Sequence, residues 1–352
     1  MKFGPVATAQ AQGAILAHSL ETSTGRIRKG TRLTADQVQA LSDTGFNTII
    51  VAILDSGDMG EDEAAQTLAN ALCGASHDTD GETVGQGLEP LPVSTGRVNI
   101  HATHSGLVFA DRDGINAFNA VNPAITLATL ADGTAVQTGD MVATLKIIPF
   151  AVPVSAVEQA SQLAKETFAL QVAPPERTRI VLIQTRLPGV KESVLDKTRR
   201  HLEKRLSKLG GSIWIESRVD HDAEALSTAL TDAMELTGFA LERDAIVVFG
   251  SSAICDAKDV IPSAVEQAGG TVISFGMPVD PGNLLMVGQL GGSFVIGAPG
   301  CARSPAENGF DWVLARITHG LPVGPDYIAG LGVGGLLKEI KSRPQPRDPH
   351  TT

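Results

Sequence analysis

The feature that most constrains the fold is an alternation of β-branched runs and amphipathic segments over residues 178–320. Apolar runs such as Ala245-Ile-Val-Val-Phe249 have the length of buried strands, and segments such as 192–209 carry apolar residues at helical spacing. Strands that alternate with helices in this way predict an α/β domain with a doubly wound, mostly parallel sheet. Pro174-Pro175 marks its start, so we place this domain at residues 174–325.

Residues 1–75 predict a small α/β unit at the N-terminus. Thr34-Ala-Asp-Gln37 is a capping-box pattern, in which a threonine hydroxyl and a glutamine amide satisfy the first turn of a helix. The β-branched run 47–54 follows as a buried strand. A second helix is expected from the acidic segment 60–63, since negative charge is favourable at a helix N-terminus.

Residues 76–173 predict a mainly β middle region that ends in a helix. Four β-branched runs lie between residues 97 and 148, and Asp-Gly and Thr-Gly turns separate the last two. The helix is expected at 155–170. The remaining residues, 326–352, form a tail that is rich in proline and charge from Lys341, and we expect its end to be disordered.

Composition excludes several function classes. The 352 residues include 28 Lys and Arg against 39 Asp and Glu, and only 4% are aromatic, which disfavours nucleic acid as a partner. No apolar run reaches the roughly 18 residues of a membrane span, so no membrane partner is expected. Cys73, Cys255 and Cys301 form no Cys-x-x-Cys pair, and no secretory segment opens the chain, which predicts a cytoplasmic protein without a disulfide framework.

Three glycine-bearing segments follow strands of the predicted C-terminal sheet, at the edge where open α/β sheets bind ligands. Glycine lets backbone N–H groups approach a ligand, and hydroxyl groups and one arginine add donors for an anion. We therefore predict a site for a small anion, although each segment could equally be a tight turn. The candidate binding residues are Gly250, Ser251, Ser252, Pro281, Gly282, Asn283, Pro299, Gly300, Cys301, Arg303 and Ser304.

Acidic and basic residues near these segments have two interpretations each. Asp256 and Asp259 either hold Mg²⁺ in a catalytic role or cap the following helix. Asp220-His221-Asp222 is either a helix cap or the edge of a site. The helix at 191–208 carries seven basic residues, as a solvated face or as the contact for an anionic partner. Cys255 and Cys301 are expected to be small buried side chains.

These segments resemble the molybdopterin-binding domain shared by molybdopterin adenylyltransferases and molybdopterin molybdotransferases. The family pattern is a Gly-Gly-Thr loop followed by Asp, a Pro-Gly-Lys-Pro turn and a Leu-Pro-Gly-Asn-Pro turn. Here the corresponding residues are 249–252 with Asp256 and Asp259, then 281–283, then 297–305. Residues 10–54 resemble a stretch of the molybdotransferase. The whole chain is similar to stand-alone bacterial molybdopterin-binding proteins.

The resemblance implies a molybdopterin-binding-like fold and molybdopterin as the ligand, with Mg²⁺ and a nucleotide for a catalytic member. It implies that 250–252 contact the phosphate or pterin, that Asp256 and Asp259 supply the acidic role, and that 299–304 close the site. Ser251 stands where the family has a second glycine, the lysine of the second turn is absent, and Cys301-Ala-Arg303 replaces Asn-Pro. These departures affect catalysis more than binding.

Three interpretations of the function therefore stay open. The first is a molybdopterin-binding protein of molybdenum cofactor biosynthesis, transferase-like, with Mg²⁺-dependent nucleotide activation or molybdate insertion. The second is a non-catalytic carrier that delivers molybdopterin to a partner nucleotidyltransferase or molybdoenzyme. A sugar-phosphate binder unrelated to molybdenum is a third reading. Relatives with this fold are commonly dimers or trimers, so a homo-oligomer is expected by analogy.

Overall fold

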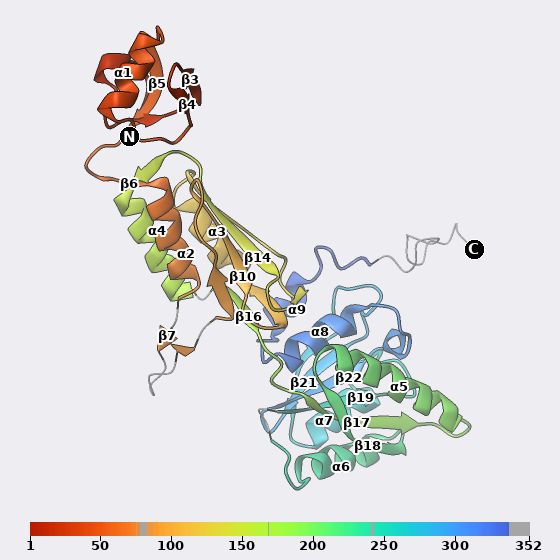
Figure 1. The fold of residues 1–352 in the computed structure, drawn as a ribbon. Helices are drawn as coiled ribbons and strands as arrows, with labels where there is room; N and C mark the ends of the chain where they lie inside the picture. Colours follow the sequence, from red (N-terminus) through yellow and green to blue (C-terminus); the bar gives the residue numbers. More distant parts are fainter. Residues whose placement is uncertain (75, 78–82, 85, 168, 241–242, 338–352) are drawn as a thin grey trace, which may run out of the picture. The chain divides into compact units, whose positions relative to one another are not determined.

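The computed structural model describes residues 1–337, except 75, 78–82, 85, 168 and 241–242. The chain divides into two units, Met1–Val172 and Ala173–Thr352, and each is described by itself (Figure 1). The disordered end predicted from Lys341 lies outside the described residues. None of the described helices is both long and apolar enough to cross a membrane.

The first part of the N-terminal unit is a three-stranded antiparallel sheet with one α-helix. Strand β5 lies between β1 and β2, and α1 packs its buried face against the sheet. The predicted capping box is confirmed, since Thr34 Oγ1 accepts from Gln37 N at 3.3 Å and Gln37 Oε1 accepts from Thr34 N at 3.0 Å. The elements are β1 (Lys2–Ala7), η1 (Thr8–Gln10), β2 (Ile15–Leu16), β3 (Leu20–Thr22), β4 (Gly25–Ile27), α1 (Ala35–Asp43) and β5 (Thr48–Ile53).

The rest of this unit combines a four-stranded sheet, in the order β12-β14-β10-β9, with helices α2 and α4, which pack side by side (Figure 1). The predicted strands and both predicted helices are present. Helix α3 was not predicted; its local signal is Asp111, whose carboxylate accepts from Gly114 N at 2.8 Å. The elements are β6 (Asp58–Gly60), α2 (Glu61–Leu72), β7 (Ser76–His77), β8 (Thr83–Val84), β9 (Leu88–Pro90), β10 (Arg97–Ala102), β11 (Gly106–Ala110), α3 (Arg112–Ala120), β12 (Ile125–Thr129), β13 (Ala135–Val136), β14 (Met141–Ile147), β15 (Ala151–Pro153), α4 (Val154–Thr167) and β16 (Leu170–Ala173).

The C-terminal unit holds a six-stranded sheet in the order β18-β17-β19-β22-β21-β20. Neighbouring strands from β18 to β22 are parallel, and β21 runs antiparallel between β22 and β20, so a mostly parallel α/β sheet is confirmed. The elements are β17 (Arg179–Arg186), α5 (Glu192–Lys208), β18 (Ser212–Asp220), α6 (Ala223–Met234), β19 (Asp244–Phe249), α7 (Val260–Gln267), β20 (Thr271–Phe275), β21 (Met286–Leu290), β22 (Ser293–Ala298), η2 (Gly300–Arg303), α8 (Gly309–Thr318) and α9 (Pro325–Gly330).

Both faces of this sheet are covered, because successive side chains of a strand point to opposite faces. On β17, Ile180 and Leu182 join the core formed with α5, α8 and α9, whereas Val181 and Ile183 join the core formed with α6 and α7. Figure 1 shows α5 and α8 on one side of the strands and α6 and α7 on the other. Strands buried on both faces explain the continuous apolar runs in the sequence.

The apolar run at 212–215 predicts a strand, and β18 continues five residues beyond that run, to Asp220. The run at 284–287 also predicts a strand, but β21 begins only at Met286, because the preceding residues belong to the turn after β20. In that turn Gly276 N donates to Leu285 O at 2.8 Å, and Met277 N donates to Asn283 O at 3.1 Å.

The amino ends of β17 and β19 are joined by an ion pair whose carboxylate is buried. Arg179 Nε and Nη2 donate to Asp244 Oδ1 and Oδ2 at 2.7 and 2.6 Å, and Asp244 is fully buried. The Arg179 guanidinium also lies 4.2 Å from the centroid of the Trp214 ring. The hydrogen bonds that Arg179 donates to the Asp244 carboxylate raise the pKa of the arginine above its ordinary value.

Candidate functional site

The carboxyl ends of five strands meet at one edge of the C-terminal sheet. Strands β18, β17, β19 and β22 are parallel, and β20 runs in their direction because β21 is antiparallel to both β20 and β22. The three glycine-bearing segments 249–252, 281–283 and 297–304 therefore follow or precede strands at this same edge. We call it the carboxyl edge.

Ser251 is engaged within the protein. Its Oγ donates to Thr185 O at 2.7 Å and accepts from Leu187 N at 3.1 Å. Its backbone N–H donates to Thr185 Oγ1 at 2.9 Å. These three hydrogen bonds tie the end of β17 to the loop that follows β19, so Ser251 shapes the loop.

Ser252 is exposed and lies next to a histidine. Its Oγ is 2.7 Å from His221 Nε2, and His221 Nδ1 is 2.7 Å from Thr185 Oγ1. Asp222, beside this histidine, caps α6 by accepting from Glu224 N and Ala225 N, both at 3.0 Å. The segment at 220–222 thus contains both a helix cap and a side chain at the carboxyl edge.

Thr185 was not among the sequence candidates. It is fully buried, at the penultimate position of β17, and its hydroxyl is the group through which Ser251 and His221 meet. A signal was available in the sequence: Gln184-Thr185 is a polar pair at the carboxyl end of an otherwise apolar strand. Buried polar side chains need partners, and such a pair at a strand end points to a network there.

The loop after β19 presents backbone donors. The N–H groups of Ser252, Ala253 and Ile254 make no hydrogen bond to any residue that the structure describes. The Ile254 side chain is buried and anchors the loop over β22, where a Cβ added to Gly297 would lie 2.8 Å from Ile254 Cδ1. Unpaired amide donors at a strand end are groups that an anion can satisfy.

Arg303 holds the carboxyl edge together. Its Nη1 donates to Thr198 Oγ1 at 2.5 Å and its Nη2 donates to Gly250 O at 3.0 Å. The guanidinium lies 5.2 Å from the centroid of the Phe249 ring, and burial lowers the pKa of Arg303. The arginine therefore connects η2, α5 and the end of β19.

Other contacts fix the 299–304 segment against α5. Arg205 donates to Ala302 O at 3.0 Å and to Ser304 O at 2.6 Å, and His201 Nδ1 lies 2.6 Å from Arg303 O. Pro299 is the N-cap of η2, Cys301 is half-buried, and a Cβ at Gly300 would meet no atom within 4 Å. The open space at that glycine leaves room for a ligand near the segment.

Asp256 and Asp259 serve as local caps. Asp259 Oδ1 accepts from Val260 N at 2.8 Å as the N-cap of α7, and its Oδ2 accepts from Cys255 N at 3.1 Å. Asp256 Oδ1 accepts from Lys258 N at 2.8 Å. Across the part of the chain that the structure describes, no group of three acidic, histidine or cysteine side chains is arranged to hold a metal ion. The carboxylates of Asp256 and Asp259 do not form a Mg²⁺ site by themselves.

Cys255 is exposed, which corrects the expectation of a buried thiol. The inward position of the loop is taken by its neighbour Ile254, which is 3% exposed, so the next side chain turns outward. Cys73 in the N-terminal unit is half-buried, and burial raises the pKa of its thiol to about 12.

The turn at 281–283 packs against the start of α8. Gly309 N donates to Pro281 O at 2.9 Å. Gly282 has φ +139°, and a Cβ there would lie 2.7 Å from Gly309 N, so only glycine fits. Asn283 instead lines a neighbouring pocket.

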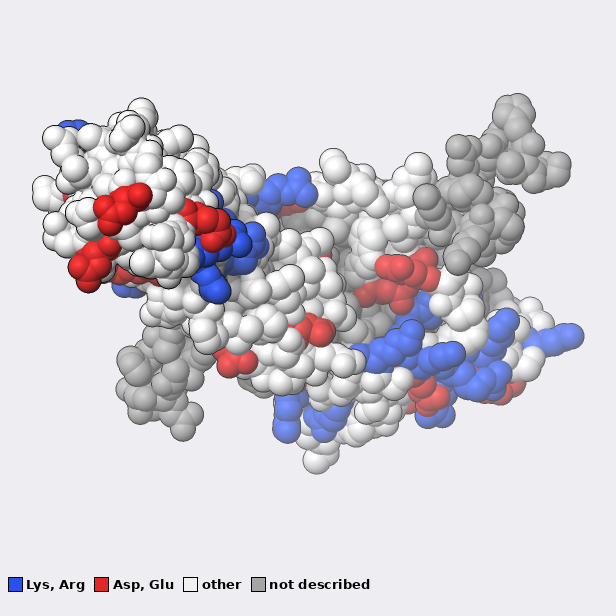
Figure 2. Space-filling model, turned by 45° about the horizontal axis from the view of Figure 1, so that its top comes forward, with Lys and Arg blue, Asp and Glu red and all other residues white. Residues whose placement is uncertain are grey.

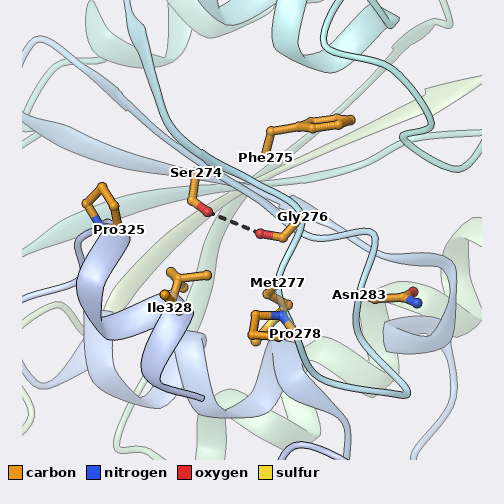
Figure 3. Close-up of a pocket in the computed structure, with 9 residues that line it drawn as sticks. Ser274, Phe275, Gly276, Met277, Pro278, Asn283, Pro325 and Ile328 are labelled. Carbon is orange, nitrogen blue, oxygen red and sulfur yellow. Dashed lines mark hydrogen bonds between the residues drawn. The ribbon is translucent and has the colours of Figure 1, made fainter. Parts of the chain in front are cut away.

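This pocket has a volume of about 630 Å³ and lies between the end of β20 and α9. Figure 3 shows Pro325 and Ile328 of α9 on one side of it and Met277 and Pro278 of the turn on the other. Ser274 Oγ donates to Gly276 O at 3.1 Å within the wall. Its lining is largely apolar, which distinguishes this half of the carboxyl edge from the hydroxyl-rich half near β19.

Basic side chains gather on α5, as one face of the surface shows (Figure 2). Lys197, Arg200, Lys204 and Lys208 recur at helical spacing and are exposed. None of the four makes an ion pair with another described residue, whereas Arg205 is paired with Asp311 at 2.6 Å. We call these four residues the basic stripe.

Comparisons with known proteins give limited matches. A family model described as a domain of unknown function (DUF8806) matches residues 5–53. No curated protein matches significantly. Among solved structures, the chain is similar to a molybdopterin biosynthesis MoeA protein from Pyrococcus horikosii, with 14% identity over 90% of this chain and 75% of that chain and a TM-score of 0.29.

Two further structures show likenesses of the same kind. A molybdenum cofactor biosynthesis protein B has 18% identity over 40% of this chain and 88% of its own, with a TM-score of 0.27. A molybdenum cofactor biosynthesis protein from Pyrococcus furiosus has 10% identity over 91% of this chain and 65% of its own, with a TM-score of 0.24. Likenesses at these TM-scores define no family for the chain.

Proposed function

We propose that the C-terminal unit binds a molybdopterin-type ligand at the carboxyl edge and acts in molybdenum cofactor biosynthesis. One observation carries the proposal: Ser252, Ala253 and Ile254 keep backbone N–H groups without an acceptor among the described residues, at the strand end where α/β sheets bind ligands. Such donors suit a phosphate. The resemblance of residues 249–252, 281–283 and 297–305 to molybdopterin-binding domains supports the pterin phosphate as the anion.

The chain's own residues would bind and orient this ligand. The loop amides and the Ser252 hydroxyl would donate to the phosphate, while Arg303 and Arg205 hold the surrounding segments in place. The largely apolar pocket beside Asn283 offers a surface to the ring end of an elongated ligand. Nucleotide activation and molybdate insertion stay within the proposal as reactions to test.

The alternative is a carrier that hands molybdopterin to a partner nucleotidyltransferase or molybdoenzyme. Two observations favour it: the carboxylates of Asp256 and Asp259 are engaged in capping, and the basic stripe on α5 has no acidic partner within the described chain. An acidic partner surface would complement the stripe. Assembly into a homo-oligomer stays a prediction.

The test measures binding and turnover separately. The purified chain is titrated with molybdopterin, followed by pterin fluorescence, and is then incubated with ATP or CTP, MgCl₂ and molybdate to detect nucleotide turnover. Binding with turnover supports the enzyme, and binding without turnover supports the carrier. The absence of molybdopterin binding overturns both.

A matched pair of serine variants locates the site. Ser252→Ala removes the hydroxyl at the carboxyl edge. The control, Ser207→Ala, removes an exposed hydroxyl at the C-terminal end of α5. We expect weaker molybdopterin binding only for the first variant. Equal affinity in both variants would place the ligand elsewhere.

A further inference from the structure

We propose that His221 is a positioning residue, which fixes the Ser252 hydroxyl as a hydrogen-bond donor to a bound oxyanion. The inference rests on the proposed anion site but not on the identity of the anion. It starts from one chain of hydrogen bonds that joins the ends of three strands: Thr185 on β17, His221 after β18 and Ser252 after β19. The direction of these hydrogen bonds decides what the serine can do.

The direction of donation along these hydrogen bonds is set at their buried end, at Thr185. Thr185 Oγ1 already accepts from Ser251 N at 2.9 Å, and the threonine is fully buried. Its own hydroxyl hydrogen needs an acceptor, and among the described residues the only further hydrogen-bond partner of this oxygen is His221 Nδ1, at 2.7 Å. A buried donor left unpaired is costly, so Thr185 donates and Nδ1 accepts.

The tautomer of the imidazole follows from this. A neutral histidine whose Nδ1 accepts a hydrogen bond carries its hydrogen on Nε2. His221 Nε2 therefore donates to Ser252 Oγ at 2.7 Å. Ser252 Oγ accepts a hydrogen bond from the histidine, so the hydroxyl hydrogen of Ser252 stays available. Because this side chain is exposed, the hydroxyl can donate to an acceptor outside the protein, such as a ligand. Each hydrogen bond of the chain polarises the next and strengthens this donor.

The ligand class follows from the donors that converge on the loop. Ser252 would offer one O–H and the loop offers the N–H groups of Ser252, Ala253 and Ile254. All are donors, so they match the oxygens of a phosphate or pyrophosphate group. The phosphate of molybdopterin and those of a nucleotide share this chemistry.

The same geometry argues against a serine nucleophile. An activated serine needs an adjacent imidazole nitrogen with a free lone pair to take its proton. Here that nitrogen, His221 Nε2, carries the hydrogen, and the group behind the ring is the neutral Thr185 rather than a carboxylate. Thr185, His221 and Ser252 are linked by hydrogen bonds as the residues of a catalytic triad are. Here, however, the histidine donates to the serine instead of accepting its proton, which suits the serine for binding.

The first arm of the test reads the tautomer without any ligand. The full chain is labelled with ¹⁵N-histidine, and long-range ¹H–¹⁵N spectra are recorded at neutral pH, with His221→Gln used to assign the resonance among the eight histidines. We expect the Nε2–H tautomer in the wild type and in Thr185→Ser, which keeps the hydroxyl. Thr185→Val should lose the single tautomer. An Nδ1–H tautomer in the wild type overturns the inference.

The second arm uses pyrophosphate as the probe, measured by calorimetry. Ser252→Ala and His221→Leu should each weaken binding roughly tenfold, as expected for one hydrogen bond to a charged group. His221→Gln, whose amide can still donate to Ser252, should recover part of that loss. Circular dichroism confirms that each variant is folded.

The outcomes separate this inference from the proposed function. Binding of pyrophosphate that weakens in Ser252→Ala but not in His221→Leu overturns the inference alone. Binding that neither variant weakens overturns the inference and also places the anion away from Ser252. No binding of pyrophosphate or molybdopterin to the wild type overturns the proposed function as well. Labelling of Ser252 by a fluorophosphonate, which reports an activated serine, would contradict the donor role, and we expect no labelling.

Discussion

The two edges of the C-terminal sheet use polar groups in opposite ways. At the amino edge Asp244 is fully buried and its carboxylate is saturated, by Arg179 on both oxygens and by Ala240 N at 2.6 Å. At the carboxyl edge Ser252 and its neighbours keep donors without acceptors in the described chain. Paired polar groups stabilise the fold, whereas unpaired donors near the surface can bind water or a ligand. Within one sheet, the polar groups of the amino edge therefore serve stability and those of the carboxyl edge are available for binding.

The largest expected effect lies at the amino edge. Asp244→Ala leaves Arg179 and Ala240 N–H without their acceptor, and removal of one partner from a buried pair costs about 3 kcal/mol. Because the Arg179 side chain is 30% exposed, water recovers part of the loss, and we expect the lower end of the usual range. Urea unfolding of the full chain measures the change.

The control for this prediction is Asp232→Ala, which removes an exposed carboxylate on α6 and should change stability little. If the two edges are independent, folded Asp244→Ala protein still binds molybdopterin with wild-type affinity. Weakened binding in this variant, measured where it is folded, would show that the edges are coupled.

A second prediction is that Arg303, at the carboxyl edge, stabilises the fold through its own hydrogen bonds. Arg303→Met removes two hydrogen bonds to partly buried groups, to Thr198 Oγ1 and Gly250 O, and should lower stability by about 2 kcal/mol. Ligand binding should weaken too, since Gly250 begins the loop that carries the donors. The free energy of unfolding and the molybdopterin affinity are measured on the same preparations.

Arg303→Lys distinguishes this bridging role from direct contact with the ligand. Lysine keeps the charge but cannot reach Thr198 and Gly250 together with a planar fork. We expect a stability between those of the wild type and Arg303→Met. A lysine variant with full ligand affinity and a strong salt dependence would instead place this cation on the phosphate.

The sequence predicted the sheet well for a physical reason. Strands such as β19 and β22 are buried along almost their whole length and adjoin glycine residues, so their apolar runs are compatible with few other structures. The three glycine-bearing segments were correctly assigned to strand ends. Helix α3 was missed because its apolar residues are sparse and Gly114 lies within its first turn.

The details of the site depend on contacts that no local pattern records. Thr185 meets His221 across 36 residues and Ser251 across 66 residues. Arg303 looked like a ligand-binding cation in the sequence, yet its hydrogen bonds to Thr198 and Gly250 arise only when η2 folds against α5. Long-range pairs of this kind are set by the fold, so sequence reasoning placed the segments but not the roles of their side chains.

Substitutions of Asp259 should change stability less, and they distinguish a helix-capping role from a metal-binding role. Asp259→Ala removes the N-cap of α7 and should lower stability by about 1 kcal/mol. Asp259→Asn keeps a capping oxygen without the charge, so it should stay near the wild type. Unfolding is measured with and without MgCl₂. Stabilisation by Mg²⁺ in the wild type that disappears in Asp259→Asn would restore the metal interpretation.

The smallest effect is a pH dependence on the side of the amino edge, where α8 ends. His319 is 4% exposed, and its Nδ1 lies 2.7 Å from Ala315 O. Burial lowers the pKa of this histidine below its unfolded value of about 6.5, so the unfolded chain takes up the proton first. The stability that His319 contributes is therefore present above that pH and is lost as the pH falls toward the folded pKa.

Between pH 7.5 and 5.5 the urea midpoint should fall less in His319→Asn than in the wild type or in His18→Asn, which changes an exposed histidine. Equal losses in all three would show that another group on the chain carries the acid sensitivity.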